Sequence, residues 1–479
     1  MKQKVSRRDV LKVGMAGLLA LPGTGLASAI LAACQSSTGG GGATKPSSLN
    51  MLYATVEADS DAIKLVVSDF KQALGIDLHL DTMPYDALQQ KVFSELASSS
   101  SFYDILIVDT PWMPALTEKI QPITGYIMDS NLTDAGKLNI TDFIPKVFYD
   151  TAVYQRSASN KHFSGGDTVD PKAVKDAGFE IYGLPIQANA LTMSYRKDLF
   201  DDAANQSAFK ARFGSDLAAP QTWEDFVKVA QFFTRPPKLY GTTLMAGNGD
   251  WATDDFKTLL ACWGGDGHLV NDQFQPVFNS PEGVAALTFY QDLINKYKVT
   301  PPGTTSASWD EVATTFGSGL AAMSFNYHTV QLNTGVNGTI AYAEVPKNVA
   351  SGPHFGTWML SVNSFSKNKE WAYKAIVWLT GSDVQTKMLQ TQLHPTRRSV
   401  YSAAQSSTQL KQFGNFYDVL GKALAAGVGR PRLRNYADVD KAVWVAVNDA
   451  ARGAKSPAAA LSSAATQVAA ALKQAGYTT

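Results

Sequence analysis

The stretch YGLPIQANALTMSYRKDLF, residues 182–200, indicates how the rest of the chain is organised. It begins as an apolar run that contains Pro185, and a proline is tolerated only at the start of a strand or at a sheet edge. Leu191, Met193 and Tyr195 then alternate with polar residues, which is typical of a strand with one buried face. The chain on either side has the pattern of an α/β unit. We therefore interpret this stretch as a crossover between two lobes, whose cleft would suit a small ligand.

The composition is that of a globular protein with two domains. A chain of 479 residues is too long for one core, and 45% apolar with 18% charged residues excludes collagen, a coiled coil and a wholly disordered chain. The net charge is zero, but residues 1–33 carry five basic residues and one acidic residue, +4, so the remainder carries −4. A mildly acidic body without a basic stripe argues against nucleic acid as a partner. Cys34 and Cys262 do not make a disulfide framework.

The first residues have the pattern of a targeting segment. A basic start precedes a weakly apolar run that ends in small residues. Residues 6–12, SRRDVLK, resemble the twin-arginine export motif, although the general export route stays open. Residues 31–34, LAAC, resemble a bacterial lipobox, which would make Cys34 the acylated first residue of the mature protein. The alternative is an uncleaved span of about 20 residues, which the glycines and the proline of the run disfavour.

A strand–helix order follows the leader. The pattern predicts strands at 49–55, 76–81 and 105–108, with a helix at 61–74 and another through Leu88–Leu96. This βαβαβ order predicts a parallel sheet with helices on its faces, and such sheets bind ligands beyond the carboxyl ends of their strands. After the crossover, helix starts are expected at Thr222 and Ser280. Residues 241–251 are expected to form a strand and then a glycine-rich loop.

Several segments, in order along residues 49–475, resemble one family. They include FYDILIVDTPWMPALTEKIQPITGYI (102–127), GLPIQANALTMSYRKDLFDD (183–202), PQTWED (220–225), FGSGLAAM (316–323) and HPTRR (394–398). Together they resemble bacterial extracellular solute-binding proteins of the sugar-binding class, which are similar to maltose-binding protein and serve ABC importers. The chain departs from the usual pattern at Arg196, where the family has asparagine.

The resemblance implies an α/β fold of the periplasmic-binding-protein type, with two lobes, a ligand cleft and a hinge of several crossings. The crossings are expected near 185–190, 326–345 and 394–398. The expected parts of the chain are a signal peptide (1–33), a flexible tether (34–48), a first lobe (49–187 plus 345–393) and a second lobe (188–344 plus 394–479).

Candidate ligand-binding residues come from the resemblance and from the supply of aromatic residues. Sugars present apolar C–H faces that lie against aromatic rings, and hydroxyls that need fixed polar partners. The candidates that lie in loops or at strand ends are Glu57, Asp109, Trp112, Asp250, Trp251, Trp263, Asn326, Tyr327, Trp358 and Tyr436. The tryptophans on helical patterns are instead expected in the core: Trp223, Trp371, Trp378 and Trp444.

The sequence carries none of the common motifs of catalysis. No nucleotide-binding or nucleophile motif is present, and the six histidines make no metal-binding pattern, so we expect no enzyme, no metal and no cofactor. The resemblance implies an exported, monomeric receptor that is lipid-anchored at Cys34 to the outer face of the cell membrane and delivers a sugar to ABC permease subunits. The alternatives are a receptor for a polyol, polyamine or phosphorylated solute, a secreted carbohydrate-active enzyme, and a lipoprotein sensor or scaffold.

Overall fold

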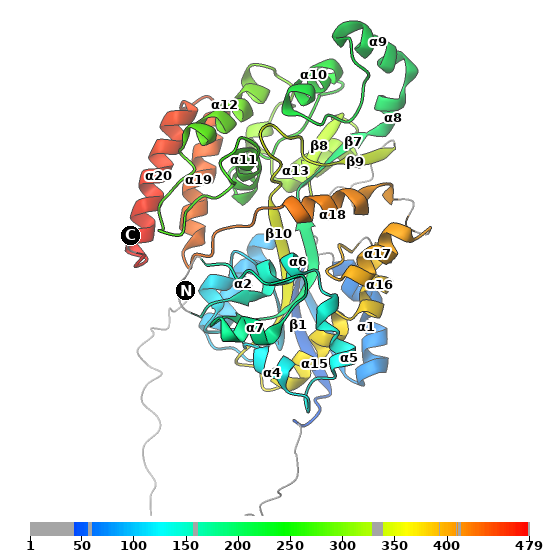
Figure 1. The fold of residues 1–479 in the computed structure, drawn as a ribbon, viewed down its shortest axis with the longest axis vertical. Coiled ribbons are helices and arrows are strands. Elements are labelled where there is room, and N and C mark those ends of the chain that lie inside the picture. The colour runs from blue at the N-terminus through cyan, green and yellow to red at the C-terminus, as the bar shows by residue number, and fades with distance from the viewer. Residues whose placement is uncertain are drawn as a thin grey trace, which may run out of the picture. The chain divides into compact units, whose positions relative to one another are not determined.

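The computed structural model describes residues 43–55, 60–156, 161–327, 339–391, 393–408, 410 and 413–477 (Figure 1). The leader with Cys34, and the candidate Glu57, lie outside the described residues. Residues Lys45–Thr479 form one compact unit. Within the described ranges, no helix is both long enough and apolar enough to cross a membrane.

The first lobe is built on a sheet whose strands come from distant parts of the chain. Among the described residues this sheet has five strands in the order β2-β1-β3-β10-β6. The strands are β1 (Ser48–Ala54), β2 (Asp77–Met83), β3 (Ile105–Asp109), β6 (Leu184–Ala190) and β10 (Phe355–Val362). β1 runs parallel to β2 and β3, as the βαβαβ pattern predicted, whereas β10 is antiparallel to both β3 and β6.

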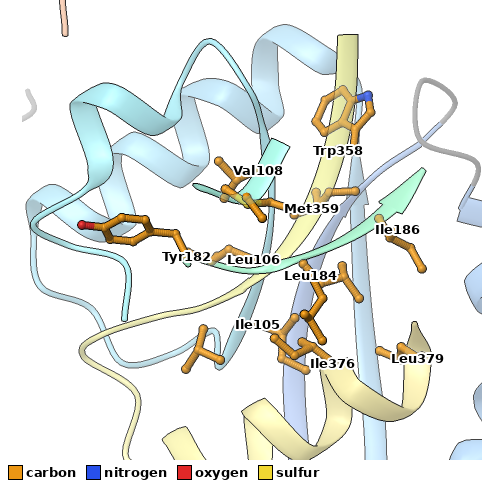
Figure 2. Close-up of a cluster of buried hydrophobic side chains, with 14 of the residues drawn as sticks. Ile105, Leu106, Val108, Tyr182, Leu184, Ile186, Trp358, Met359, Ile376 and Leu379 are labelled. Carbon is orange, nitrogen blue, oxygen red and sulfur yellow. The ribbon is translucent and has the colours of Figure 1, made fainter. Parts of the chain in front are cut away.

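Helices cover this sheet because their apolar residues recur at helical spacing. Ile63, Val66 and Phe70 are buried on α1 (Ser60–Leu74), and Gly75 follows that helix with a φ of 61°, a conformation that glycine adopts readily. Figure 2 shows the packing of β3, β6 and β10 side chains against Ile376 and Leu379 of α15 (Lys369–Leu379). The first lobe also contains the following helices and strands: α2 (Tyr85–Ala97), α3 (Met113–Leu116), α4 (Thr124–Met128), α5 (Ala135–Leu138), α6 (Pro145–Ala152), β4 (Val153–Tyr154), α7 (Pro171–Asp176), β5 (Glu180–Ile181), α16 (Ser382–Met388) and α17 (Arg398–Ser406).

The second lobe has its own sheet and its own core. In the described part of the chain its sheet has the order β8-β7-β9, with β7 (Thr192–Arg196) antiparallel to β8 (Met323–Asn326) and to β9 (Ile340–Ala343). β6 and β7 are separated only by Leu191 yet belong to different sheets, in agreement with the expected crossover. The helices of this lobe are α8 (Lys197–Asp201), α9 (Ala203–Phe213), α10 (Trp223–Phe233), α11 (Asp250–Cys262), α12 (Pro281–Asn295), α13 (Trp309–Gly317), α19 (Tyr436–Ala451) and α20 (Pro457–Gln474).

The helix starts at Thr222 and Ser280 are as predicted, but the expectation for residues 241–251 was wrong. Thr222 and Ser280 cap α10 and α12 through their side chains. No strand forms at 241–249, and α11 already begins at Asp250. The backbone of 241–249 finds partners outside a ladder: Met245 N–H donates to the Asp255 carboxylate (2.9 Å) and Gly247 N–H to the Ala307 carbonyl (2.9 Å). Asp250 therefore lies in the first turn of a helix.

The last two crossings between the lobes lie later in the sequence than the stretches 326–345 and 394–398 in which we expected them. The backbone of Lys347 pairs with Thr222, so this segment still belongs to the second lobe. The buried Arg397 donates to the Leu138 and Asn139 carbonyls (both 2.9 Å) and thus belongs to the first lobe. The chain then passes through α18 (Phe416–Ala426), which lies between the two sheets, and His354 pairs with Val428 beyond it (Figure 1). The contacts therefore locate the last two crossings near 353–355 and 427–430.

Candidate ligand-binding site

The first lobe contributes an acid and a ring from neighbouring strands. Asp109 is the last residue of β3, and Trp358 faces it in the antiparallel pair of β10 with β3. Asp109 is only 3% exposed. Its Oδ2 accepts a hydrogen bond from the Tyr85 hydroxyl (2.9 Å), and its Oδ1 accepts one from Thr110 N–H (2.7 Å). A carboxylate is thus fixed at the carboxyl end of a parallel strand, the edge at which sheets of this kind bind ligands.

Aromatic rings from both lobes meet around Tyr85, the first residue of α2. Its ring centroid lies 5.3 Å from that of Trp112, 5.8 Å from that of Trp358 and 5.5 Å from that of Trp309. Trp309 is the first residue of α13 and belongs to the second lobe. Its ring in turn lies 5.2 Å from that of Trp251 on α11. The two lobes are therefore in direct aromatic contact beside Asp109.

The second lobe contributes an acidic helix face. Asp250 and Asp254 are four residues apart on α11, so their side chains lie on the same face. Asp254 is fully buried, and its Oδ2 accepts hydrogen bonds from Arg430 Nη2 (2.9 Å) and from the Tyr327 hydroxyl (3.2 Å). His354 Nε2 lies 3.2 Å from Asp254 Oδ1, and its Nδ1 is hydrogen-bonded to the same tyrosine hydroxyl. Burial lowers the pKa of His354 well below its ordinary value, so this ring is neutral.

Arg430 joins the acids of the two lobes. Its side chain is 5% exposed, and it lies 3.9 Å from Asp109 Oδ2 and 3.7 Å from Asp250 Oδ2, besides the hydrogen bond to Asp254. Gly356 makes room for the guanidinium, because a Cβ there would lie 3.1 Å from Arg430 Nη1. One cation on a crossing segment thus pairs with carboxylates from both sides of the cleft.

Two cavities adjoin this arrangement and share Tyr85. The inner cavity has a volume of about 40 Å³ and is lined by Tyr85, Asp109, Asn189, Trp309, Tyr327, Gly356, Trp358 and Arg430. The outer cavity has a volume of about 360 Å³ and is lined by both lobes, α2 and the segment after β3 on one side, and α11 and α19 on the other. Small-molecule sites commonly measure about 300–1,000 Å³. The outer cavity therefore has the size of a ligand site, and the inner cavity has room only for water.

The buried acidic side chains of the site outnumber the buried cationic side chains near them. In the described part of the chain, Asp109, Asp250, Asp254 and Asp440 surround Arg430 and Lys257. Burial raises the pKa of Asp254 to about 6 and that of Asp440 to about 7. Burial, together with Asp440 and Asp254, raises the pKa of Asp250 well above its usual range. If all six groups were ionised, four carboxylates against two cations would leave an excess of two negative charges, which is costly away from water, and the raised pKa values of the acids are in line with that cost.

Most of the candidates from the sequence come together here. Asp109, Tyr327 and Trp358 line the inner cavity, and Trp112, Asp250, Trp251 and Tyr436 line the outer cavity. Asn326 lines neither cavity: it is fully buried and donates from Nδ2 to the Trp309 carbonyl (3.1 Å). Trp263 also lies elsewhere, with its ring 4.8 Å from that of Phe289 and 6.1 Å from that of Trp223.

Sequence reasoning missed several lining residues. They include Tyr85, Asn189, Trp309, Gly356, Arg430, Arg434, Asp440, Lys441 and Trp444, the last of which was expected in the core. The spacing of Tyr436 and Asp440, one turn apart on a predicted helix, was a usable signal. Arg430 gave no local signal, because its partners lie 321 and 176 residues away along the chain.

Comparisons with known proteins agree with this architecture. A "Probable ABC transporter-binding protein" of Deinococcus radiodurans is 26% identical over 261 residues, which are 52% of this chain and 59% of that protein. A "Probable amino-acid ABC transporter periplasmic-binding protein" of Sinorhizobium fredii is 24% identical over 438 residues, 88% of this chain and 89% of that protein.

Solved structures share the fold over most of the chain. Maltose-bound MalE3 of T. maritima has a TM-score of 0.71 at 23% identity and covers 88% of this chain and 98% of its own. A ribitol complex of an ABC transporter solute-binding protein from Agrobacterium radiobacter K84 has a TM-score of 0.71 at 24% identity and covers 90% of this chain and 100% of its own. The expected periplasmic-binding-protein fold is confirmed.

The model of one protein family matches residues 54–386, which is well over half of the chain. This chain belongs to the family of bacterial extracellular solute-binding proteins.

Proposed function

We propose that this protein is an exported receptor that binds a sugar or a polyol between its lobes and presents it to the permease of an ABC importer. The observation that carries the proposal is the outer cavity, in which carboxylates and tryptophans from both lobes converge. Rings offer flat apolar surfaces to the C–H faces of such ligands, and carboxylates accept hydrogen bonds from their hydroxyls. The maltose and ribitol complexes of the same fold support these two ligand classes.

Binding between the lobes would couple the ligand to a hinge motion. A ligand stabilises the closed arrangement only if it contacts both lobes at once. Trp112 from the first lobe, and Trp251 and Tyr436 from the second, line the same cavity. The chain passes from one lobe to the other near residues 190, 353–355 and 427–430, and the lobes would move as rigid bodies about these crossings to open and close the cavity. The permease could then distinguish a loaded receptor from an empty one.

The leader supports attachment to the outside of the cell membrane. We infer that Cys34 is acylated after removal of residues 1–33 and that residues 34–48 form a tether, since four glycines in a row occur at 39–42. The body of the protein would then work as a monomer at the membrane surface. A Cys34→Ser variant, followed by fractionation of cells into membrane and soluble material, tests the anchor: the variant should lose its membrane fraction, and retention there would contradict it.

Solutes that carry an amino group are a second possible ligand class. The four buried carboxylates of the site favour them, and so does the name of the Sinorhizobium relative. Both classes describe a receptor that releases its ligand unchanged. A carbohydrate-active enzyme with the same cavity would instead convert it.

A thermal-shift screen separates these possibilities. Residues 35–479 contain the compact unit, and they can be tested against mono- and disaccharides, polyols and polyamines. A ligand at 100 times its Kd adds about 2.7 kcal/mol to the free energy of unfolding, which raises the midpoint measurably. A saturable shift with a sugar or polyol that is recovered unchanged would support the proposal. Shifts with polyamines alone would contradict the proposal. Consumption of the sugar would indicate that the protein is an enzyme and not a receptor.

A further inference from the structure

The outer cavity combines aromatic walls with buried acids, whereas the two cations among its lining residues, Arg434 and Lys441, are exposed. Trp112 of the first lobe and Trp251 and Trp444 of the second lobe line it, together with Asp250 and Asp440. The Asp440 side chain is nearly buried, at 7% residue exposure, and its Oδ1 accepts no hydrogen bond from any described residue. A buried carboxylate oxygen without a donor is costly, so a group supplied from the cavity would stabilise it.

The two buried cations near these acids, Arg430 and Lys257, are engaged elsewhere. Arg430 donates to Asp254 at 2.9 Å and is 3.7 Å from Asp250. Lys257 directs its Nζ to backbone carbonyls, at 2.6 Å from Gly267 O and 2.9 Å from Gly429 O. Neither ammonium nor guanidinium therefore makes a hydrogen bond to Asp440 among the described residues.

Three further polar atoms of residues that line the same cavity have no hydrogen-bond partner among the described residues. The Tyr436 hydroxyl, the Trp112 Nε1 and the Trp251 Nε1 are buried and make no hydrogen bond with the described part of the chain. Tyr436 is 5% exposed and Trp112 is 2% exposed. Indole N–H groups can only donate, so they require an acceptor on the ligand, such as a hydroxyl oxygen. The cavity thus presents acceptors for a cation together with donors for hydroxyl groups.

We propose that the outer cavity binds an amino sugar or an amino polyol, with its ammonium group paired with Asp250 and Asp440 and its carbon skeleton against the tryptophans. This proposal rests on the receptor function and specifies its ligand. An ammonium group brings a positive charge that pairs with these acids, and it also interacts favourably with the faces of tryptophan rings. A neutral sugar can donate hydroxyl hydrogens to the same oxygens but brings no charge that would favour their ionised forms.

If an amine binds beside Asp250 and Asp440, its binding should release protons. Burial and the neighbouring Asp254 raise the pKa of Asp440 to about 7, while a hydrogen bond to the Thr253 side chain, Arg430 and Lys257 act in the opposite direction. Asp250 has a pKa raised well above its ordinary value, by burial and then by Asp440 and Asp254. Asp440 is therefore partly protonated near neutral pH, and the pKa of Asp250 is displaced in the same direction. An adjacent ammonium favours their ionised forms, so binding of an amine drives protons into the buffer.

Isothermal titration at pH 7 on residues 35–479 tests the proposal with matched probes. Glucamine is compared with sorbitol, and glucosamine with glucose and N-acetylglucosamine. We expect each amine to bind at least tenfold more tightly than its neutral counterparts. Repeating the titration in two buffers of different ionisation enthalpy should reveal proton release for the amines and none for the neutral compounds.

Variants on one helix provide the control. Asp440→Asn should reduce the affinity for glucamine at least tenfold and affect sorbitol far less, whereas the exposed Asp438→Asn on α19 should change neither. Thermal midpoints of both variants check that they are folded.

The outcomes separate the proposal from the function on which it rests. If sorbitol or glucose binds as tightly as its amine, the amino-ligand proposal is wrong and the receptor function stands. If spermidine binds and no carbohydrate does, both the carbohydrate function and this proposal are wrong. Binding of none of these compounds would overturn both as well.

Discussion

Replacing Arg430 by methionine should destabilise the protein strongly and in a pH-dependent manner. The guanidinium is the cation shared by Asp109 and Asp254, whose residues are 3% and 0% exposed. Removing one partner of a buried ion pair costs about 3–5 kcal/mol, because the remaining charge is left unpaired away from water. We expect a loss of this size in the free energy of unfolding at pH 8, measured by urea denaturation.

The pH dependence follows from the acids that remain. With Arg430 present, burial already raises the pKa of Asp254 to about 6, and removal of the cation raises it further. A carboxyl with a raised folded-state pKa contributes stability at low pH that is lost as the pH rises through that value. The deficit of Arg430→Met should therefore be smaller at pH 5 than at pH 8.

A double variant and a matched arginine test the reasoning. Asp254→Asn in the Arg430→Met background should recover part of the loss, because it removes one uncompensated charge. Arg452 pairs with Asp449 at 2.9 Å on the surface, with 52% of its side chain exposed, so Arg452→Met should cost less than about 1 kcal/mol. A loss below about 1 kcal/mol for Arg430→Met at pH 8, or the same loss at both pH values, would refute the account of Arg430 as the shared counterion.

Two further changes test the site. Asp440→Asn should raise the free energy of unfolding of the ligand-free protein by up to about 4 kcal/mol at pH 8 and by less at pH 5, since a carboxyl with a pKa raised to about 7 destabilises the fold once it ionises. Thermal unfolding at both pH values measures this difference, and equal effects at the two pH values would contradict it. Gly356→Ala should lower the free energy of unfolding by about 1–3 kcal/mol, because the added Cβ would lie 3.0 Å from His354 Cε1 and 3.1 Å from Arg430 Nη1. Urea denaturation should show this loss. In the Arg430→Met background the loss should be smaller, since the contact with the guanidinium is gone.

The sequence predicted the local elements well where the pattern was strong. The strand at β1 followed from a short apolar run and the helix at α1 from apolar residues at a spacing of three to four, and Thr222 was recognised as the cap of α10. Residues 241–249 misled us, since an apolar run predicts a strand only if a partner strand is available. Here Asp255 and Ala307 satisfy the backbone of this run instead.

The site was only partly predictable because its members meet through tertiary structure. Asp109 and Trp358 were found through the resemblance, and they lie opposite one another on neighbouring strands. Trp263 follows the last residue of α11, whereas Asp250 is the first, so the two ends of this helix are about 20 Å apart at 1.5 Å per residue. Arg430 belongs to no motif, and only the packing of the crossing segment brings it to both lobes.

The central claim is that a carbohydrate or related solute binds between the lobes, and one titration tests it most directly. Isothermal titration with the solute found by the thermal-shift screen is carried out on the wild type, Trp251→Leu and Trp263→Leu. Trp251 lines the outer cavity, whereas Trp263 packs against Phe289 away from both cavities. We predict that Trp251→Leu weakens binding about tenfold, which corresponds to about 1.4 kcal/mol, while Trp263→Leu leaves the Kd unchanged. Unchanged affinity in Trp251→Leu with a loss in Trp263→Leu would contradict the site described above.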